Sequence, residues 1–206
     1  MTEMDYVWYA SYGSNLLETR FHCYISGGTP EGSSKAERGC TNPAQPLKVE
    51  PISLPYEMYF SEYSTRWRGG VAFINTVKDY SVRTYGKKYL ITSEQFKQIV
   101  QQENDNYEMD IDLELARNVH TFSFNDSWYG NILYLGEADG YPIFTFTDNR
   151  TISEKKITTP SLPYLKNIFN GLADFYKDVD HIIHYLYSKK GVSEGYSLKD
   201  LKKIFT

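Results

Sequence analysis

The pattern of apolar residues changes near Pro160. Before this point, short segments rich in aromatic and β-branched residues alternate with turn signals, which is typical of a mostly antiparallel sheet or a small barrel. The expected strands are 6–12, 52–60, 70–77, 85–91, 111–117, 130–135 and 143–147. After Pro160, apolar residues recur at helical spacing. We therefore predict an α+β fold, with a small mixed, mostly antiparallel β-barrel or sheet and flanking helices.

Helices are expected at 16–25, at 93–103, after Pro160, and near 182–189 and 198–205. The stretch from 26 to 51 is rich in Gly, Pro and Ser and has no periodicity, so it is interpreted as an inserted loop, either a lid or a disordered insertion. We find no linker that would divide the chain. The prediction is a single domain over 1–206, with a loop insertion at about 26–51 and extra helices after about 180.

Composition and charge argue against a nucleic-acid-binding or membrane-spanning protein. The chain has 206 residues and a net charge of −4, which is the wrong sign for a protein that neutralises nucleic acid phosphates. No apolar run approaches the length of a membrane span, and the N-terminus lacks the pattern of a signal peptide. We expect a cytoplasmic protein with a small-molecule substrate and neither a nucleic acid nor a membrane as partner; the oligomeric state is left open.

The helix expected at 93–103 carries an acidic residue in an unusual position. Thr92 and Gln95 match a capping box, which defines where the helix begins. Counting from that start, the apolar stripe at i, i+3 and i+4 consists of Phe96, Ile99 and Val100. The next position on that stripe is Glu103, and a carboxylate on a buried face has its pKa raised toward that of a general base. The alternative is that the helix has ended by Asn104 and that Glu103 points to water.

A second candidate feature is the turn Tyr12-Gly13-Ser14-Asn15-Leu16. A strand that ends in Gly-Ser-Asn and opens a helix aims successive backbone N–H groups at one point, and such groups attract anions, for example a carboxylate. On physical grounds alone, an ordinary strand-to-helix turn explains the same residues.

Four blocks of the sequence, in this order, resemble the γ-glutamylcyclotransferase-like family. The first and most specific is the run from Tyr9 to Leu16, which contains Tyr-Gly-Ser-Asn-Leu. The second is Trp-Arg-Gly-Gly-Val-Ala at 67–72, similar to the family's aromatic-Gly-Gly-x-Ala strand. The third is Glu103, which stands after a helix and shortly before Tyr107. The fourth begins at Pro160-Ser161 and includes Tyr164, Ile168 and Gly171.

This resemblance implies an activity and a set of site residues. Members release a γ-glutamyl group as 5-oxoproline without metal or cofactor. Glu103 would be the catalytic general acid/base: it would take a proton from the α-ammonium of the substrate and pass one to the leaving amine. Backbone amides of the turn would hold the substrate's α-carboxylate, and tyrosines would line the cavity. The expected substrate-binding residues are Tyr12, Gly13, Ser14, Asn15, Leu16, Tyr107 and Tyr164.

The sequence also departs from the family's pattern. Gln101 and Gln102 precede Glu103, and Asn104 follows it, where the family commonly has Asp earlier on the helix and Gly after the glutamate. The insertion and the additional C-terminal helices bear on which substrate can enter more than on the fold, because loops beside a site control access to it. Two alternatives therefore stay open. One is a non-catalytic module that retains the pocket and binds a small molecule or a partner, and the other is an amide hydrolase on the same fold.

Overall fold

The computed structural model describes residues 5–31, 33, 35–105 and 109–206. The chain divides into two compact units. Unit 1 takes the chain up to Ser11 together with Thr19–Ile52 and Lys87–Asn149, and unit 2 takes Tyr12–Glu18, Ser53–Gly86 and Arg150–Thr206. The single-domain organisation expected over 1–206 stays a prediction.

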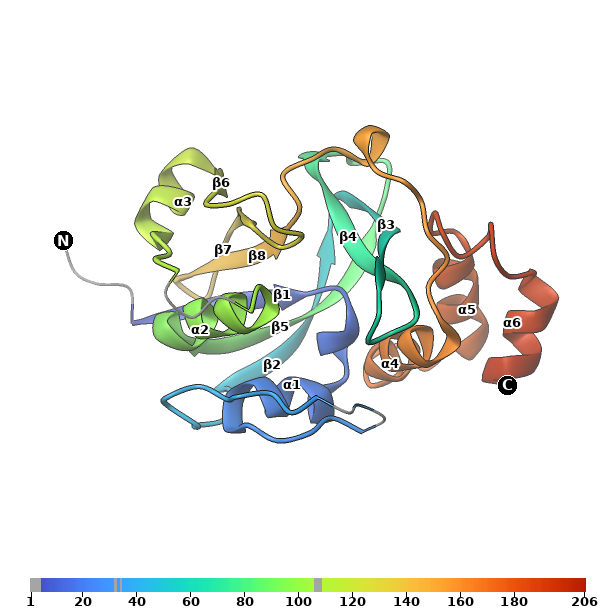
Figure 1. Cartoon of the computed structure of the whole chain (residues 1–206), viewed down its shortest axis with the longest axis horizontal. Coiled ribbons are helices and arrows are strands. Elements are labelled where there is room, and N and C mark those ends of the chain that lie inside the picture. The colour runs from blue at the N-terminus through green and yellow to red at the C-terminus, as the bar shows by residue number, and fades with distance from the viewer. Residues whose placement is uncertain (1–4, 32, 34, 106–108) are drawn as a thin grey trace. The chain divides into compact units, whose positions relative to one another are not determined.

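The larger sheet is mixed and lies largely in unit 1 (Figure 1), and in the described part of the chain it has six strands in the order β2-β5-β1-β8-β7-β6. The strands are β1 (Tyr6–Ser11), β2 (Lys48–Leu54), β5 (Thr84–Thr92), β6 (Thr121–Ser123), β7 (Asn131–Ala138) and β8 (Tyr141–Thr147). β1 pairs antiparallel with β5 and parallel with β8, and β7 pairs antiparallel with β8. The predicted α+β class is confirmed. The barrel alternative is wrong, because β2 and the short β6 stand at opposite edges of an open sheet.

Three helices of unit 1 contribute to the core on one face of this sheet. They are α1 (Glu18–Ser26), α2 (Ser93–Glu103) and α3 (Leu113–Val119). Strand alternation turns Val7 and Tyr9 toward this core, where the Tyr9 ring stacks on Phe146 with centroids 5.3 Å apart. The many aromatic residues of the sequence thus fill the space between the helices and the sheet.

Two predicted strands are corrected. The segment 111–117 was expected to be a strand, but Leu113–Val119 forms α3. The Asp112 side chain accepts a hydrogen bond from Leu115 N at 2.8 Å, which caps the helix, and Leu113 and Ala116 bury one face. The segment 52–60 was expected to be continuous, but β2 ends at Leu54 and the next strand begins after Pro55, which has no N–H to donate.

The inserted loop packs against α1 and α2 rather than standing as a lid. Its last residues, 48–51, belong to β2, and Gly28 and Glu37 form an isolated bridge within it. Cys40 N donates to Ile25 O at 2.9 Å, and its thiol donates to Tyr24 O at 3.3 Å. Burial, and secondarily the charge of Glu94, raises the pKa of the Cys40 thiol to about 12. The described part of the loop is therefore anchored to the body of unit 1.

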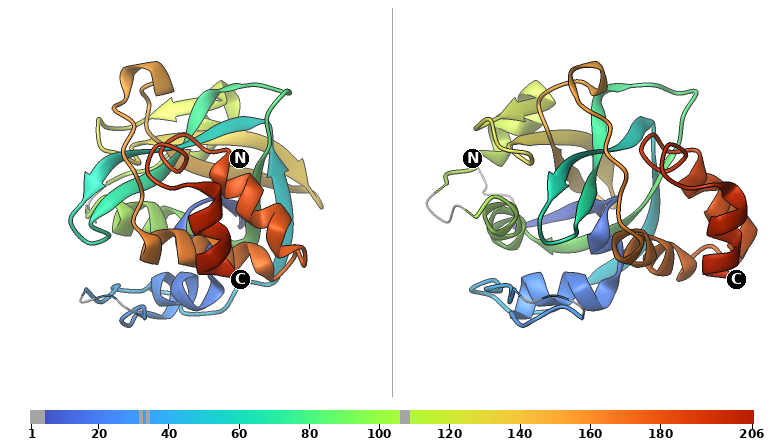
Figure 2. Two further views of the ribbon diagram at one scale, coloured as in Figure 1. Left: turned by 90° about the vertical axis from the view of Figure 1, so that its right-hand side faces the viewer. Right: turned by 45° about the vertical axis from the view of Figure 1, so that its right-hand side comes forward.

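Unit 2 combines a β-ribbon with helices. Its elements are η1 (Ser14–Leu16), β3 (Tyr56–Ser64), β4 (Gly69–Lys78), η2 (Ile152–Glu154), α4 (Leu162–Ala173), α5 (Val179–Tyr187) and α6 (Leu198–Phe205). β3 and β4 pair antiparallel. The helices expected near 182–189 and 198–205 correspond to α5 and α6, which lie side by side in both views of Figure 2.

Helix α4 approaches η1 very closely at Gly171. A Cβ atom at this position would lie 2.3 Å from the carbonyl carbon of Leu16. Only a glycine therefore permits the observed distance between this helix and the short turn. The contact seats the turn that follows β1 on the surface of α4.

Candidate functional site

The turn that the sequence singled out is a buried 3₁₀ turn. Gly13 precedes η1 with φ −108° and ψ −143°, and Leu16 N donates to the Gly13 carbonyl at 3.0 Å. Leu17 N donates to the Ser14 carbonyl at 3.3 Å. The side chains of Tyr12, Ser14, Asn15 and Leu16 are all buried. The turn thus holds five of the seven residues predicted for substrate binding, and the Leu16 amide is used to close it.

Tyr164 stands beside this turn. It lies in the first half of α4 and is buried, and its hydroxyl accepts a hydrogen bond from Ala72 N at 3.1 Å. The same hydroxyl oxygen is 3.2 Å from the point where a Cβ of Gly13 would stand. The Trp67 ring meets the Tyr164 ring edge-on, with centroids 4.9 Å apart. The structure therefore brings Tyr164 to the predicted turn, while its role toward a ligand stays a prediction.

The Gly-Gly pair of the second sequence block has a packing role. A Cβ at Gly70 would lie 2.2 Å from the Thr158 carbonyl oxygen, and Gly70 N donates to the Thr159 carbonyl at 2.8 Å. This close approach brings β4 against the segment that leads into α4. The block thereby sets the distance between Ala72 on β4 and Tyr164 on α4.

Glu103 is the last residue of α2. The predicted capping box is present: Gln95 N donates to the Thr92 hydroxyl at 3.1 Å, and Thr92 N donates to the Gln95 side chain at 3.0 Å. The expectation that Glu103 continues the buried stripe is corrected, because Glu103 is only half-buried and Gln102 is buried instead. The helix ends at this point, with Asn104 as its C-cap, and Gln102 is buried by its hydrogen bonds to backbone groups of Gly39 and Tyr24. Glu103 belongs to unit 1, whereas the turn and Tyr164 belong to unit 2.

Tyr107, also predicted to bind substrate, lies outside the described residues. Across 5–31, 33, 35–105 and 109–206, no three His, Cys, Asp or Glu side chains are grouped so that they could hold a metal ion. Over the same residues, the structure contains no helix with the length and apolar character needed to cross a membrane.

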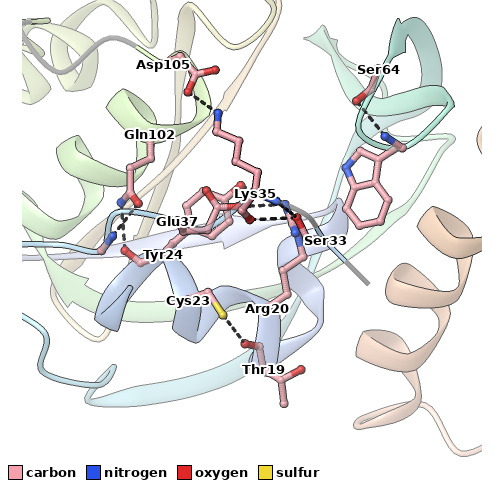
Figure 3. Close-up of polar contacts among 12 residues, drawn as sticks. Thr19, Arg20, Cys23, Tyr24, Ser33, Lys35, Glu37, Ser64, Gln102 and Asp105 are labelled. Carbon is pink, nitrogen blue, oxygen red and sulfur yellow. Dashed lines mark hydrogen bonds and ion pairs between the residues drawn. The ribbon is translucent and has the colours of Figure 1, made fainter. Parts of the chain in front are cut away.

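A buried ion pair, which was not predicted from the sequence, joins α1 to the inserted loop. Arg20 Nη2 lies 3.8 Å from Glu37 Oε1, and both side chains are almost fully buried. Arg20 also donates to the Tyr24 hydroxyl at 3.1 Å, and Figure 3 shows Arg20, Tyr24 and Glu37 close to one another. The aperiodic loop gave no signal for this pair, since nothing in the local sequence links Glu37 to a residue of α1.

A cavity of about 460 Å³ opens between the N-terminal ends of α2 and α3. Its acidic lining residues are Asp5, Glu94, Asp110, Asp112 and Glu114. Neither Glu103 nor a residue of the turn lines it. Of the predicted site residues that the structure describes, none therefore lines this cavity.

The fold has known counterparts. The chain matches a solved γ-glutamyl cyclotransferase with a TM-score of 0.54 and 15% identity over 98% of both chains. It matches an uncharacterized protein from Homo sapiens with the same TM-score, identity and coverage. At this identity the likeness shows the fold alone, so the chain has the fold of γ-glutamyl cyclotransferases.

A sequence comparison finds a similar segment within a much longer protein. Histone deacetylase 5 of Arabidopsis thaliana is 34% identical over 185 residues, which cover 82% of this chain and 28% of that protein. The chain thus spans less than a third of that relative's length. No protein-family model matches the chain.

Proposed function

We propose that this chain is a cofactor-independent cyclotransferase that releases 5-oxoproline from a small γ-glutamyl amide or amine, with Glu103 as general acid/base. The observation that carries the proposal is the fold, which extends over nearly the whole length of a solved γ-glutamyl cyclotransferase. The buried turn at Gly13–Leu16 and the carboxylate at the end of α2 support it, because they are the residues that the family resemblance assigns to the substrate and to the proton transfer.

The turn would hold the α-carboxylate of the substrate. Backbone N–H groups of Gly13, Ser14 and Asn15 are suited to an anion because they carry partial positive charge and need no counterion. The Leu16 amide would serve the turn itself, since it donates to the Gly13 carbonyl. Tyr164 would line the site next to Gly13, and Tyr12 would complete the wall from the end of the strand.

The reaction forms one bond and breaks one. Glu103 takes a proton from the α-ammonium, the freed amine attacks the γ-carbonyl carbon, and the bond from that carbon to the leaving nitrogen breaks. Glu103 returns its proton to the leaving nitrogen, and the second proton that the attacking nitrogen loses ends on the released amine. No water or cofactor is consumed. Because nucleophile and electrophile share one molecule, holding them in the reactive geometry supplies a large part of the acceleration.

The test is product analysis with a panel of γ-glutamyl amino acids, γ-glutamyl amines and glutathione. Glu103→Gln keeps the shape of the side chain and removes the base. We expect the wild type to release 5-oxoproline from at least one compound and the variant to lose about 10²–10⁴-fold in rate. Glu94→Gln is the matched control, because Glu94 is an exposed carboxylate in the first turn of the same helix.

The products separate the alternatives. Glutamate instead of 5-oxoproline would identify an amide hydrolase. Turnover that survives in Glu103→Gln would refute the role of Glu103. If the wild type turns over no compound of the panel, the cyclotransferase proposal is refuted.

A second candidate is a non-catalytic binding module, and one observation favours it. The sequence similarity to histone deacetylase 5 of Arabidopsis thaliana covers only a minor part of that longer protein. A domain of this kind would bind a small γ-glutamyl compound or a partner without turning it over. Isothermal titration with the same panel would then detect binding by the wild type without product.

A further inference from the structure

Three glutamines form a row along one face of α2. Gln95, Gln98 and Gln102 follow at spacings of three and four, which places them above one another on the helix. Their side-chain amides hydrogen bond to the backbone of the loop segment 39–44. The bonds are Gly39 N to Gln102 Oε1 at 3.0 Å, Thr41 N to Gln98 Oε1 at 2.8 Å, and Gln95 Nε2 to Asn42 O at 2.9 Å and to Ala44 O at 2.8 Å. The side chains of the row therefore satisfy backbone N–H and C=O groups of the loop, as the backbone of a neighbouring strand would.

Gln102 differs from the other two because it also binds α1. Its Nε2 donates to the Tyr24 carbonyl at 3.0 Å while its Oε1 accepts from Gly39 N. Figure 3 shows the side chain of Gln102 directed from α2 toward these backbone groups. The side chain is buried with both its oxygen and its nitrogen bonded, which is the condition for a buried amide to be stable. Gln102 thus joins the last turn of α2 to two other segments at once.

The residues after Glu103 are anchored as well. Asn104 Nδ2 donates to the Val100 carbonyl at 2.8 Å and to the Tyr129 carbonyl at 3.2 Å. Asp105 accepts from Lys35 Nζ at 2.6 Å, a bond between exposed side chains that contributes little. Glu103 therefore stands between the buried side chain of Gln102 and the half-buried side chain of Asn104, and the hydrogen bonds of these two residues hold its backbone in place.

We propose that Gln102 is a positioning residue for the reaction assigned to Glu103, and this inference rests on that proposed function. Its two bonds fix the last turn of α2, and the position of that turn sets where the Glu103 carboxylate stands. A displacement of about 1 Å at a reacting group costs about 10²-fold in rate. Of the inserted loop, the Gly39 amide takes part in this support, because it is one of the two partners of Gln102.

The test compares Gln102→Ala with Gln95→Ala under the assay of 5-oxoproline release. Both side chains are buried and bind the same loop, but Gln95 lies eight positions before Glu103, about 12 Å along the helix axis. We expect Gln102→Ala to lower kcat about 10- to 100-fold with KM changed less than about threefold. Gln95→Ala should keep kcat within about threefold of the wild type, even where urea unfolding shows an equal or larger loss of stability.

Gln102→Asn keeps an amide with both an acceptor and a donor on a side chain one methylene shorter, so it should recover part of the kcat lost in Gln102→Ala. It also serves as the second variant if Gln102→Ala does not fold. Equal kcat values in Gln102→Ala and Gln95→Ala, or a loss expressed only in KM, would overturn the positioning role alone. Absence of turnover by the wild type would instead refute the proposed function, and the positioning role with it.

Discussion

Gly171→Ala tests the contact that seats the turn on α4. The added methyl would lie 2.3 Å from the Leu16 carbonyl carbon, 2.5 Å from its oxygen and 2.6 Å from its Cβ. Carbon atoms pack at about 3.5–4 Å, so the helix and the turn must separate by about 1 Å or more. Overpacking costs about 1–3 kcal/mol, and the upper end applies because the neighbours are backbone atoms. Alanine is a better helix former than glycine by about 1 kcal/mol, so the free energy of unfolding should fall by about 2 kcal/mol in total.

Urea and thermal unfolding followed by circular dichroism measure this loss. For a chain of this size, about 2 kcal/mol corresponds to a fall in Tm of roughly 4–8 °C. Asn170→Ala is the control, because Asn170 is exposed in the same helix and its replacement should leave the stability unchanged or slightly higher. A Gly171→Ala variant as stable as the wild type would refute the close approach between α4 and the turn.

Two further perturbations probe other parts of the fold. Burial lowers the pKa of Lys189 to about 8, against an opposing effect of Glu57, so between about pH 8 and 10.5 the unfolded chain binds more protons and stability should rise with pH. The urea midpoints of the wild type and Lys189→Met are compared from pH 7 to about pH 10. A constant difference between them would contradict the lowered pKa of Lys189. Asp112→Ala should destabilise α3 by about 1 kcal/mol, because the helix loses its N-cap hydrogen bond. Asp110→Ala is the control, since Asp110 is exposed and should not change the stability. Equal unfolding midpoints for the two variants would argue against the helix.

Much of the secondary structure follows from local chemistry. The capping box at Thr92 and the apolar stripe after it predicted α2 with the bounds that the structure has, because both signals lie within a few residues of the helix itself. The helices after Pro160 were predictable for the same reason. α3 was not, since a segment of seven residues is too short for periodicity to separate a helix from a strand.

The candidate site was predictable only in part. The turn at Gly13–Leu16 and Tyr164 were identified from the sequence, and the structure brings them together through the packing of α4 and β4. Glu103 was expected on a buried stripe, yet Gln102 takes the buried position. Hydrophobic periodicity cannot foresee this, because Gln102 is buried by hydrogen bonds to a loop more than sixty residues away.

Local sequence patterns specified the fold class, the approximate positions of many strands and helices, and the residue types that could hold a carboxylate or move a proton. These depend on alternation, helical spacing and capping, which act over a few residues. Long-range packing, in contrast, makes the sheet open, binds the inserted loop to the glutamine row and brings Ala72 of β4 to Tyr164 of α4. Each of these features depends on hydrogen bonds or packing contacts between segments that are far apart in the sequence, so no local pattern predicts them.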